Sequence, residues 1–163
     1  MRKCVESAKL GRISFSTCLE VDARRLTINL TRAEDLPKFG ICGPPDPCVR
    51  IILEQNNFRQ TKQTRILKST YHPVFKEAVM FLVSAKEDDL NNTCLTISVV
   101  DTSLGANVED VIGQVVLGKY AKSKISIDQW RNTIRNPGKE IKATHALRSV
   151  EENLELKVER LAS

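Results

Sequence analysis

Cysteine and histidine are the residues of this chain best suited to covalent catalysis or tight metal binding. They stand at Cys4, Cys18, Cys42, Cys48, Cys94, His72 and His145. Paired zinc ligands are usually separated by about two to four residues, and the nearest two cysteines lie further apart than that. No histidine lies in a metal-binding or nucleophile motif, so we expect a binding protein and not an enzyme. The odd cysteine count and irregular spacing favour reduced, buried thiols in a cytosolic protein.

The charged residues indicate an anionic partner. The chain carries 25 Lys and Arg against 20 Asp and Glu, a net charge of +5. Such a surplus favours acidic lipid, acidic protein or nucleic acid, although charge that only keeps a protein soluble would look the same. Nucleic acid is the weakest of these partners, because the basic residues lack the interleaved exposed aromatics that single-strand binding uses. We therefore expect no nucleic acid partner.

Alternating apolar and polar residues place these side chains on short β-strands. The alternation is clean over 25–32, where Leu26, Ile28 and Leu30 share one face. Other strands are predicted at 12–20, 48–54, 58–66, 78–83, 95–100 and 111–117, of which the apolar segment 78–83 is predicted to be central. Several short strands separated by turns indicate an all-β sandwich, and an apolar fraction of 41% is enough for one core.

Two capping patterns predict helices toward the C-terminus. A capping box over 126–129 predicts a short helix that carries Trp130 and ends before Asn136. The same pattern over 149–152 predicts a second helix. Its apolar stripe consists of Val150, Leu154, Val158 and Leu161. We expect this stripe to pack on the domain, with partner binding as the alternative.

Four motifs in a fixed order resemble those of C2 domains. They read LPK at 36–38 followed by DPCVRI at 46–51, YHPVFKE at 71–77, ISVVD at 97–101, and DVIG at 110–113. Each motif is weak alone, but their order and spacing agree with the family over about residues 10–150. The resemblance implies an eight-stranded antiparallel C2 β-sandwich with short helices near the C-terminus. We expect a lead-in over 1–10, the domain over 11–149, and an amphipathic helix over 150–163.

The C-terminal part resembles the second C2 domain of a synaptotagmin or synaptotagmin-like protein. In that family a helix bearing Trp precedes an Asn-Pro turn and a strand reading W-H-x-L. Here Trp130 is followed by Asn-Pro at 136–137 and by His145-Ala146-Leu147, with Thr144 in place of the second Trp. A basic pair follows the Asn-Pro turn in the family, and Gly-Lys stands there in this chain.

The resemblance also implies a calcium site on two loops. Calcium takes about six to eight oxygen ligands, and five acidic positions supply most of them in calcium-binding C2 domains. The corresponding positions here are Gly40, Asp46, Asp101, Ser103 and Asp110, with Glu109 as the alternative for the last. With two carboxylates lost, we expect no cofactor and calcium-independent function. The alternatives are a weak site completed by Glu109 or a backbone carbonyl, and a purely structural role for Asp46 and Asp101 in turns.

Two more features of the resemblance concern membranes. A lysine-rich strand of the second synaptotagmin C2 domain binds phosphoinositides and acidic partners. The basic residues of the matching stretch and of the strand before it are Arg50, Arg59, Lys62, Arg65 and Lys68. Strand alternation predicts Arg59 and Arg65 on one face, with Lys62 and Lys68 on the other. The apolar loop tips Phe39, Ile41 and Leu104 are candidates for entering a bilayer.

These features predict a calcium-independent C2 module for membrane trafficking or exocytosis. Its expected partners are acidic phospholipid membranes, and beside them SNARE-type fusion proteins or another C2 domain. The alternatives are a calcium-dependent phospholipid sensor with substitute ligands and an interaction scaffold without a lipid role. No apolar run approaches the roughly 20 residues that span a bilayer, and no secretory signal is recognisable. We expect a cytoplasmic domain, peripheral at vesicle or plasma membrane, with an anchor elsewhere in a longer parent protein still compatible.

Overall fold

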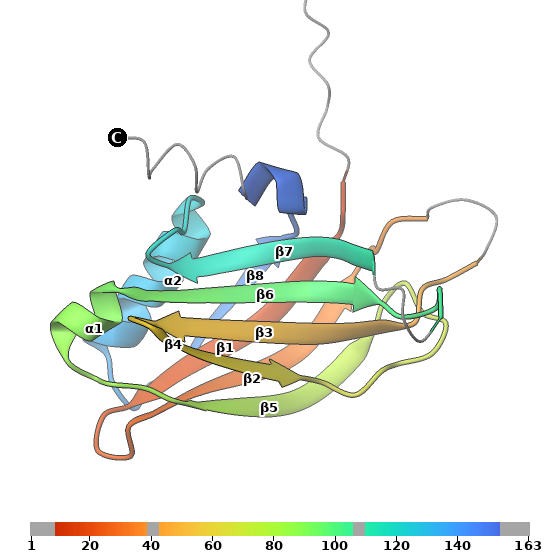
Figure 1. Ribbon diagram of the computed structural model, residues 1–163. Coiled ribbons are helices and arrows are strands. Elements are labelled where there is room, and N and C mark those ends of the chain that lie inside the picture. The colour runs from red at the N-terminus through yellow and green to blue at the C-terminus, as the bar shows by residue number, and fades with distance from the viewer. Residues whose placement is uncertain (1–8, 39–42, 106–109, 154–163) are drawn as a thin grey trace, which may run out of the picture.

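Eight β-strands form two four-stranded antiparallel sheets that pack face to face in the computed structural model (Figure 1). The structure describes residues 9–38, 43–105 and 110–153. One sheet has the order β5-β2-β1-β8 and the other the order β4-β3-β6-β7. The elements are β1 Arg12–Glu20, β2 Arg25–Glu34, β3 Pro47–Gln55, β4 Phe58–Gln63, β5 Val74–Leu82, α1 Glu87–Asn91, β6 Thr93–Asp101, β7 Asp110–Gly118, α2 Lys124–Arg135 and β8 Ile141–Ala146. The prediction of an eight-stranded antiparallel sandwich is confirmed.

The core lies between the sheets and is built from alternate residues of the strands. Leu26, Ile28 and Leu30 of β2 are fully buried, as the clean alternation of that segment predicts. Ile51 and Leu53 of β3 face them from the other sheet. Truncating a buried Leu or Ile of this kind to Ala typically costs about 2–5 kcal/mol. This core makes the sandwich a rigid support for the loops at its two ends.

Strand β5 lies at the edge of its sheet, so its predicted central position is wrong. It pairs only with β2, and its side chains alternate between the core and solvent. Phe81 is buried, whereas Met80 is 50% and Leu82 is 70% exposed. The apolar composition of 78–83 is typical of a strand buried on both faces, but here the outward half of it is exposed to water.

The helix predicted to carry Trp130 is present and ends before Asn136 as predicted, but it begins earlier than predicted. Ser123 caps α2, because its hydroxyl accepts a hydrogen bond from the Ser126 amide at 3.1 Å; the capping box predicted at Ser126 lies one turn too late. At the C-terminal helix, the Ser149 hydroxyl accepts from the Glu152 amide at 3.2 Å, and residues 150–153 are helical. The rest of that stripe, Leu154, Val158 and Leu161, lies outside the described residues. The short helix α1 was not predicted.

The sandwich has two long sides on which an edge strand of one sheet faces an edge strand of the other. On one side, the Gln60 side chain of β4 donates to the Leu82 carbonyl of β5 at 2.6 Å and accepts from the Leu82 amide at 3.1 Å. We call this side the β4–β5 seam. A side-chain amide there takes the place of a backbone partner for the edge of β5.

The other long side, the β7–β8 seam, is closed by the chain itself. Gln114 of β7 and Arg148 exchange two backbone hydrogen bonds, of 2.7 and 3.0 Å, and α2 packs across β7, β8 and β1. Gly113 permits this closure, because a Cβ at that position would approach the Leu147 Cβ to 2.8 Å. The segment after β8 therefore lies directly against β7.

Candidate functional site

The loop end of the sandwich gathers the acidic residues that the sequence singled out. Asp46 immediately precedes β3, Asp101 ends β6, and Asp110 begins β7. The register pairs Pro47, the residue after Asp46, with Asp101, and Asp101 with Asp110. The three carboxylates therefore lie at the same end of this sheet. Glu109 and Gly40 lie outside the described residues.

Two of these carboxylates are occupied by hydrogen bonds from the protein itself. Asp46 Oδ1 accepts from the Ser69 amide at 2.8 Å. Asp101 Oδ1 accepts from the Asp46 amide at 3.0 Å and from the Ser103 amide at 2.9 Å. These contacts join three loops that are remote in sequence. The Asp101–Ser103 bond is the local contact expected of a turn-forming Asp, whereas the bonds from Ser69 to Asp46 and from Asp46 to Asp101 tie separate loops together.

A lysine ammonium lies beside one of these carboxylates. Lys68 Nζ is 3.5 Å from Asp46 Oδ2, and the Lys68 side chain is 79% exposed. An exposed pair of this kind adds little stability, but it places a positive charge where a calcium ion would have to bind. The described residues contain no group of three or more His, Cys, Asp or Glu side chains that could hold a metal ion. Among the described residues, the carboxylates at this end of the sheet are too few to complete a calcium site by themselves.

Of the predicted membrane-facing tips, only Leu104 falls within the described residues. It lies in the loop after β6 and is 55% exposed. Phe39 and Ile41 lie outside the described residues.

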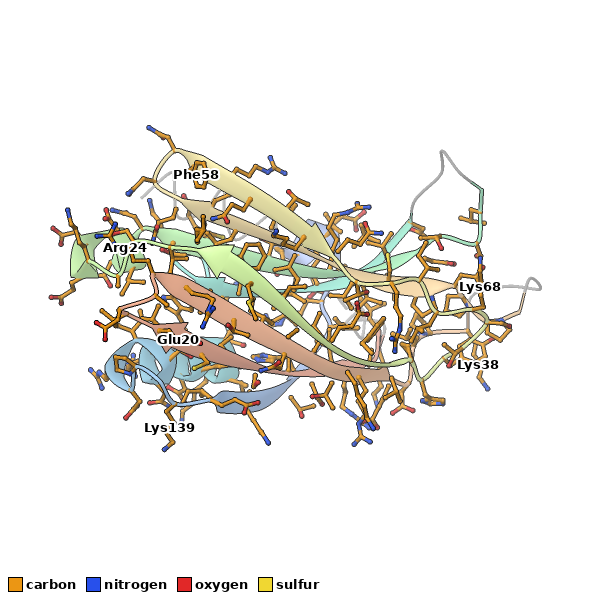
Figure 2. All side chains as sticks on the ribbon, turned by 90° about the horizontal axis from the view of Figure 1, so that it is seen from below. Glu20, Arg24, Lys38, Phe58, Lys68 and Lys139 are labelled. Atoms are coloured by element: carbon orange, nitrogen blue, oxygen red, sulfur yellow. The ribbon has the colours of Figure 1, made fainter. Side chains whose placement is uncertain are left out.

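The five basic residues of the predicted binding face do not form one cluster. Strand β4 ends at Gln63, so Arg65 and Lys68 lie beyond it, and Lys68 is paired with Asp46. Arg65 Nη2 donates to the Phe75 carbonyl at 2.9 Å, and its amide donates to the Glu77 carboxylate. The sequence predicts Arg59 and Arg65 on one face of the strand, with Lys62 and Lys68 on the other. This prediction is wrong, because the strand ends before Arg65 and Lys68. Figure 2 shows Phe58 and Lys68 at opposite ends of the molecule.

The remaining basic residues occupy two faces of β4. Arg50 and Arg59 stand on the outer face of the sheet, where Arg50 Nη2 donates to Gln63 Oε1 at 3.2 Å. Lys62 pairs with Ile51 in register and lies on the other face of this edge strand, on the same side as Phe58 and Gln60. Within the described ranges, neither Arg59 nor Lys62 makes an ion pair. Phe58 is 61% exposed, and the sequence pattern gave no signal for this apolar residue beside the two cations.

The comparison with protein families decides what this arrangement is. The model of the C2 domain family matches residues 24–133, which is more than half of the chain. This chain belongs to the C2 domain family.

Curated relatives of this C2 domain include several synaptotagmins. Synaptotagmin-3 of Mus musculus is 34% identical over 144 residues, which is 87% of this chain and 24% of the relative. Synaptotagmin-A of Diplobatis ommata is 33% identical over 149 residues, 90% of this chain and 34% of the relative. The chain thus spans a quarter to a third of the length of these proteins.

Solved C2 domains share the fold of this one. The third C2 domain of the KIAA1228 protein superposes with a TM-score of 0.67 at 18% identity and covers 92% of this chain and 96% of its own. The first C2 domain of human synaptotagmin XIII gives a TM-score of 0.60 at 16% identity, with 86% and 88% covered. No helix in the described part of this C2 domain is long and apolar enough to cross a membrane.

Beneath α2 the C2 domain contains a buried polar network centred on His145. The Gln129 amide nitrogen donates to the Ile141 carbonyl at 3.1 Å, which turns its oxygen toward His145 Nε2 at 2.6 Å. His145 Nε2 is therefore the protonated ring nitrogen, and Nδ1 accepts from the Ser126 hydroxyl at 3.3 Å. The ring stacks on Phe15, with centroids 4.9 Å apart. Burial lowers the pKa of His145 to about 4.

Proposed function

We propose that this C2 domain is a non-enzymatic binding module that docks on acidic phospholipid membranes without calcium, in membrane trafficking or exocytosis. The observation that carries the proposal is the pairing of Lys68 with Asp46, at 3.5 Å. This pairing places the Lys68 ammonium beside Asp46 at the loop end of the sandwich. Arg59 and Lys62 on β4 stay available for anionic lipid. A dication approaching Asp46 would have to displace the lysine and compete with the backbone donors.

The membrane-binding surface is proposed to be β4 with the turn before it. Lys62 supplies positive charge on the same face of β4 as Phe58, the exposed aromatic first residue of that strand, and Arg59 adds positive charge from the outer face. An aromatic ring beside cations suits the boundary between headgroups and acyl chains. Arg50 lies on the same outer face as Arg59 but pairs in register with Gln63, whereas Arg65 and Lys68 serve the structure of the loop end.

The magnitude of this attraction is small. Each basic side chain near an anionic surface contributes about 1 kcal/mol, so Arg59, Lys62 and Arg50 together contribute about 3 kcal/mol. Partial burial of Phe58 adds about 1 kcal/mol, and about 4 kcal/mol corresponds to roughly millimolar affinity. We infer that stable attachment requires a second binding site in the parent protein, acting through effective concentration.

Vesicle co-sedimentation tests the proposal. The full chain is mixed with vesicles of phosphatidylcholine and phosphatidylserine, in calcium or in chelator. We expect the same binding in both conditions, and a loss of about tenfold or more in Arg59→Gln/Lys62→Gln because two favourable charges are removed. Phe58→Ser should weaken binding without changing its salt dependence.

The matched control is Lys124→Gln/Lys142→Gln, which removes two exposed charges from α2 and β8. It should change binding less than about threefold, since only the long-range field is reduced. Binding that requires calcium would contradict the proposal, as would equal losses in the two double variants. If neither the wild type nor any variant bound vesicles, the proposal would be wrong. The acidic surface of a protein partner, such as a SNARE-type protein, would then be the expected ligand of β4.

A further inference from the structure

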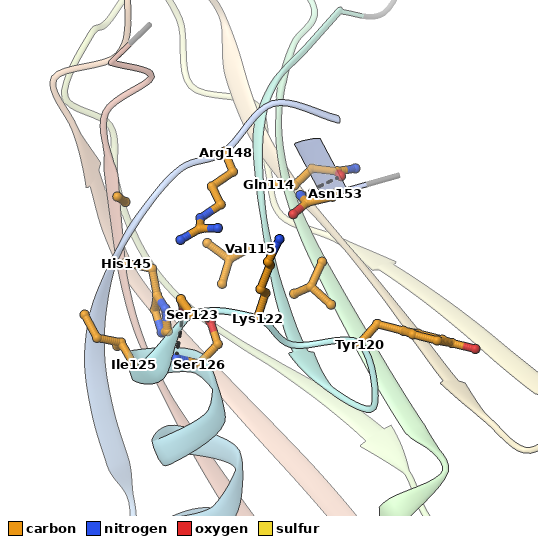
Figure 3. A pocket seen from close by; sticks show the side chains of 12 residues that line it. Gln114, Val115, Tyr120, Lys122, Ser123, Ile125, Ser126, His145, Arg148 and Asn153 are labelled. Atoms are coloured by element: carbon orange, nitrogen blue, oxygen red, sulfur yellow. Dashed lines mark hydrogen bonds between the residues drawn. The ribbon is translucent and has the colours of Figure 1, made fainter. Parts of the chain in front are cut away.

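A small cavity opens between β7, the loop before α2, and the segment after β8. Its volume is about 130 Å³, and Figure 3 shows the side chains around it. Its walls are formed by Gln114, Val115, Val116, Tyr120, Lys122, Ser123, Ile125, Ser126, His145, Ala146, Arg148 and Asn153. None of these residues is acidic. The cavity lies on the β7–β8 seam, away from β4.

Two cations reach this cavity from different elements. Lys122 comes from the loop that leads into α2, and Arg148 from the segment that follows β8 (Figure 3). Arg148 is held in place by the two backbone bonds with Gln114. In the described ranges, the side chains of Lys122 and Arg148 form no ion pair or hydrogen bond. Two like charges that line one cavity repel each other, and an anion bound between them offsets that repulsion.

The rest of the wall is polar on the side of the cations. Ser123 and Ser126 hydroxyls stand at the start of α2, and the Asn153 amide is fixed by donating to Gln114 Oε1 at 3.3 Å. The first turn of α2 contains no acidic side chain, so its positive end is not neutralised from within the helix. Val115 and Ile125 supply the apolar floor and rim.

The size and charge of the cavity specify the ligand. A space of about 130 Å³ holds several waters, so it is large enough for a tetrahedral oxyanion. A phosphate monoester carries about −1.5 to −2 charges at neutral pH, which two cations balance. A carboxylate would satisfy only one of them.

We propose that this cavity binds the phosphate group of a phosphate monoester through Lys122 and Arg148. The site is separate from the surface proposed on β4 and does not depend on it. Two kinds of ligand carry a phosphate monoester group: a soluble phosphate ester and a lipid with a monoester headgroup. The cavity is open enough at its mouth for the rest of either ligand to remain outside.

The soluble arm of the test uses NMR of the isotope-labelled full chain. Glycerol 3-phosphate is added stepwise while the chloride concentration is lowered to keep the ionic strength constant. We expect saturable shifts of amides around residues 114, 122, 123 and 148, with a Kd of roughly a millimolar. Lys122→Gln/Arg148→Gln should weaken binding about tenfold or more, because two charge-assisted bonds are lost. Arg59→Gln/Lys62→Gln, a variant of the same net charge on the distant strand β4, should change it less than about twofold.

The lipid arm compares phosphatidic acid vesicles, which present a monoester, with phosphatidylserine vesicles of equal surface charge. A preference for phosphatidic acid that disappears in Lys122→Gln/Arg148→Gln identifies the headgroup as the source. Saturable binding of glycerol 3-phosphate without that preference identifies a soluble ester. The proposal is overturned if neither arm responds, or if the response survives in Lys122→Gln/Arg148→Gln. Arg59→Gln/Lys62→Gln should leave the soluble arm unchanged, which separates this site from the β4 surface.

Discussion

The two seams of the sandwich solve the same problem in different ways. At the β4–β5 seam, side chains close the gap: Gln60 bonds both backbone groups of Leu82, and Arg65 reaches the Phe75 carbonyl. At the β7–β8 seam, backbone hydrogen bonds between Gln114 and Arg148 close it, and α2 covers the rest. A closure by side chains stays at the surface, whereas a closure by a helix encloses whatever lies beneath it.

Because of this difference, the two sides contribute differently to the stability of the domain. The β4–β5 seam leaves Phe58, Lys62 and Leu82 exposed, which suits a contact surface. The β7–β8 seam buries His145 and Gln129 and leaves a small polar cavity next to them. Polar groups at the first seam can exchange their partners for water, while those at the second cannot. Equivalent substitutions should therefore cost much more at the β7–β8 seam.

The largest effect is expected for Gln129→Ala under α2. Gln129 is 2% exposed and bonds the Phe15 and Ile141 carbonyls as well as His145. Its removal leaves buried polar groups without partners and opens a cavity, so the free energy of unfolding should fall by about 3–4 kcal/mol. Urea unfolding followed by fluorescence of Trp130 measures this. Asn132→Ala, at an exposed position of the same helix, is the control, and a similar loss there would contradict the contrast between the seams.

The second expectation concerns pH and also belongs to the β7–β8 seam. The pKa of His145 is about 4 in the folded chain, below the ordinary value of 6.5. Above 6.5 both states are neutral, and as pH falls below it the unfolded state takes up a proton that the folded state refuses. Stability should thus fall between pH 6.5 and 4, by about 3 kcal/mol at most.

Unfolding curves at several pH values compare the wild type with His145→Gln. The variant should lack this part of the slope, although it shares the slope that carboxylates add at the acid end. Parallel curves across the whole range would show that His145 has the same pKa in the folded and unfolded states, which would contradict the lowered pKa.

The smallest effect is expected at the other seam, for Gln60→Ala. Its two bonds to Leu82 lie at the surface, where water replaces them, so the loss should be about 1 kcal/mol or less. Hydrogen exchange of the Leu82 amide should accelerate because that amide loses its acceptor. A loss as large as that of Gln129→Ala would erase the distinction between the two seams.

The sequence predicted the strands well where one face is buried and the other is not. Leu26, Ile28 and Leu30 alternate with polar residues, and β2 follows them. It failed at β5, because Met80 and Leu82 are apolar yet exposed, and composition does not report which strand ends a sheet. It placed the start of α2 one turn late, because Ser123 and Ser126 are both good caps and only the fold selects between them.

The candidate sites were harder to predict, because they depend on contacts between distant segments. The chain motifs located Asp46 and Asp101, but not Lys68 at 3.5 Å from Asp46. Arg65 looked like one more basic strand residue until the strand ended two residues before it. Lys122 and Arg148 belong to no motif, and only the closure of β8 against β7 brings them to one cavity.

The register of β1 and β8 has a mechanical consequence. The first residue of β1, Arg12, pairs with the last residue of β8, Ala146, and the Leu147 amide donates to the Gly11 carbonyl at 2.9 Å. A force that pulls residues 9 and 153 apart would load these hydrogen bonds one after another, as in opening a zipper. Because each bond carries the force alone before the next one is loaded, β8 should separate from β1 at a low force. The hydrogen bonds of the other sheet should stay intact.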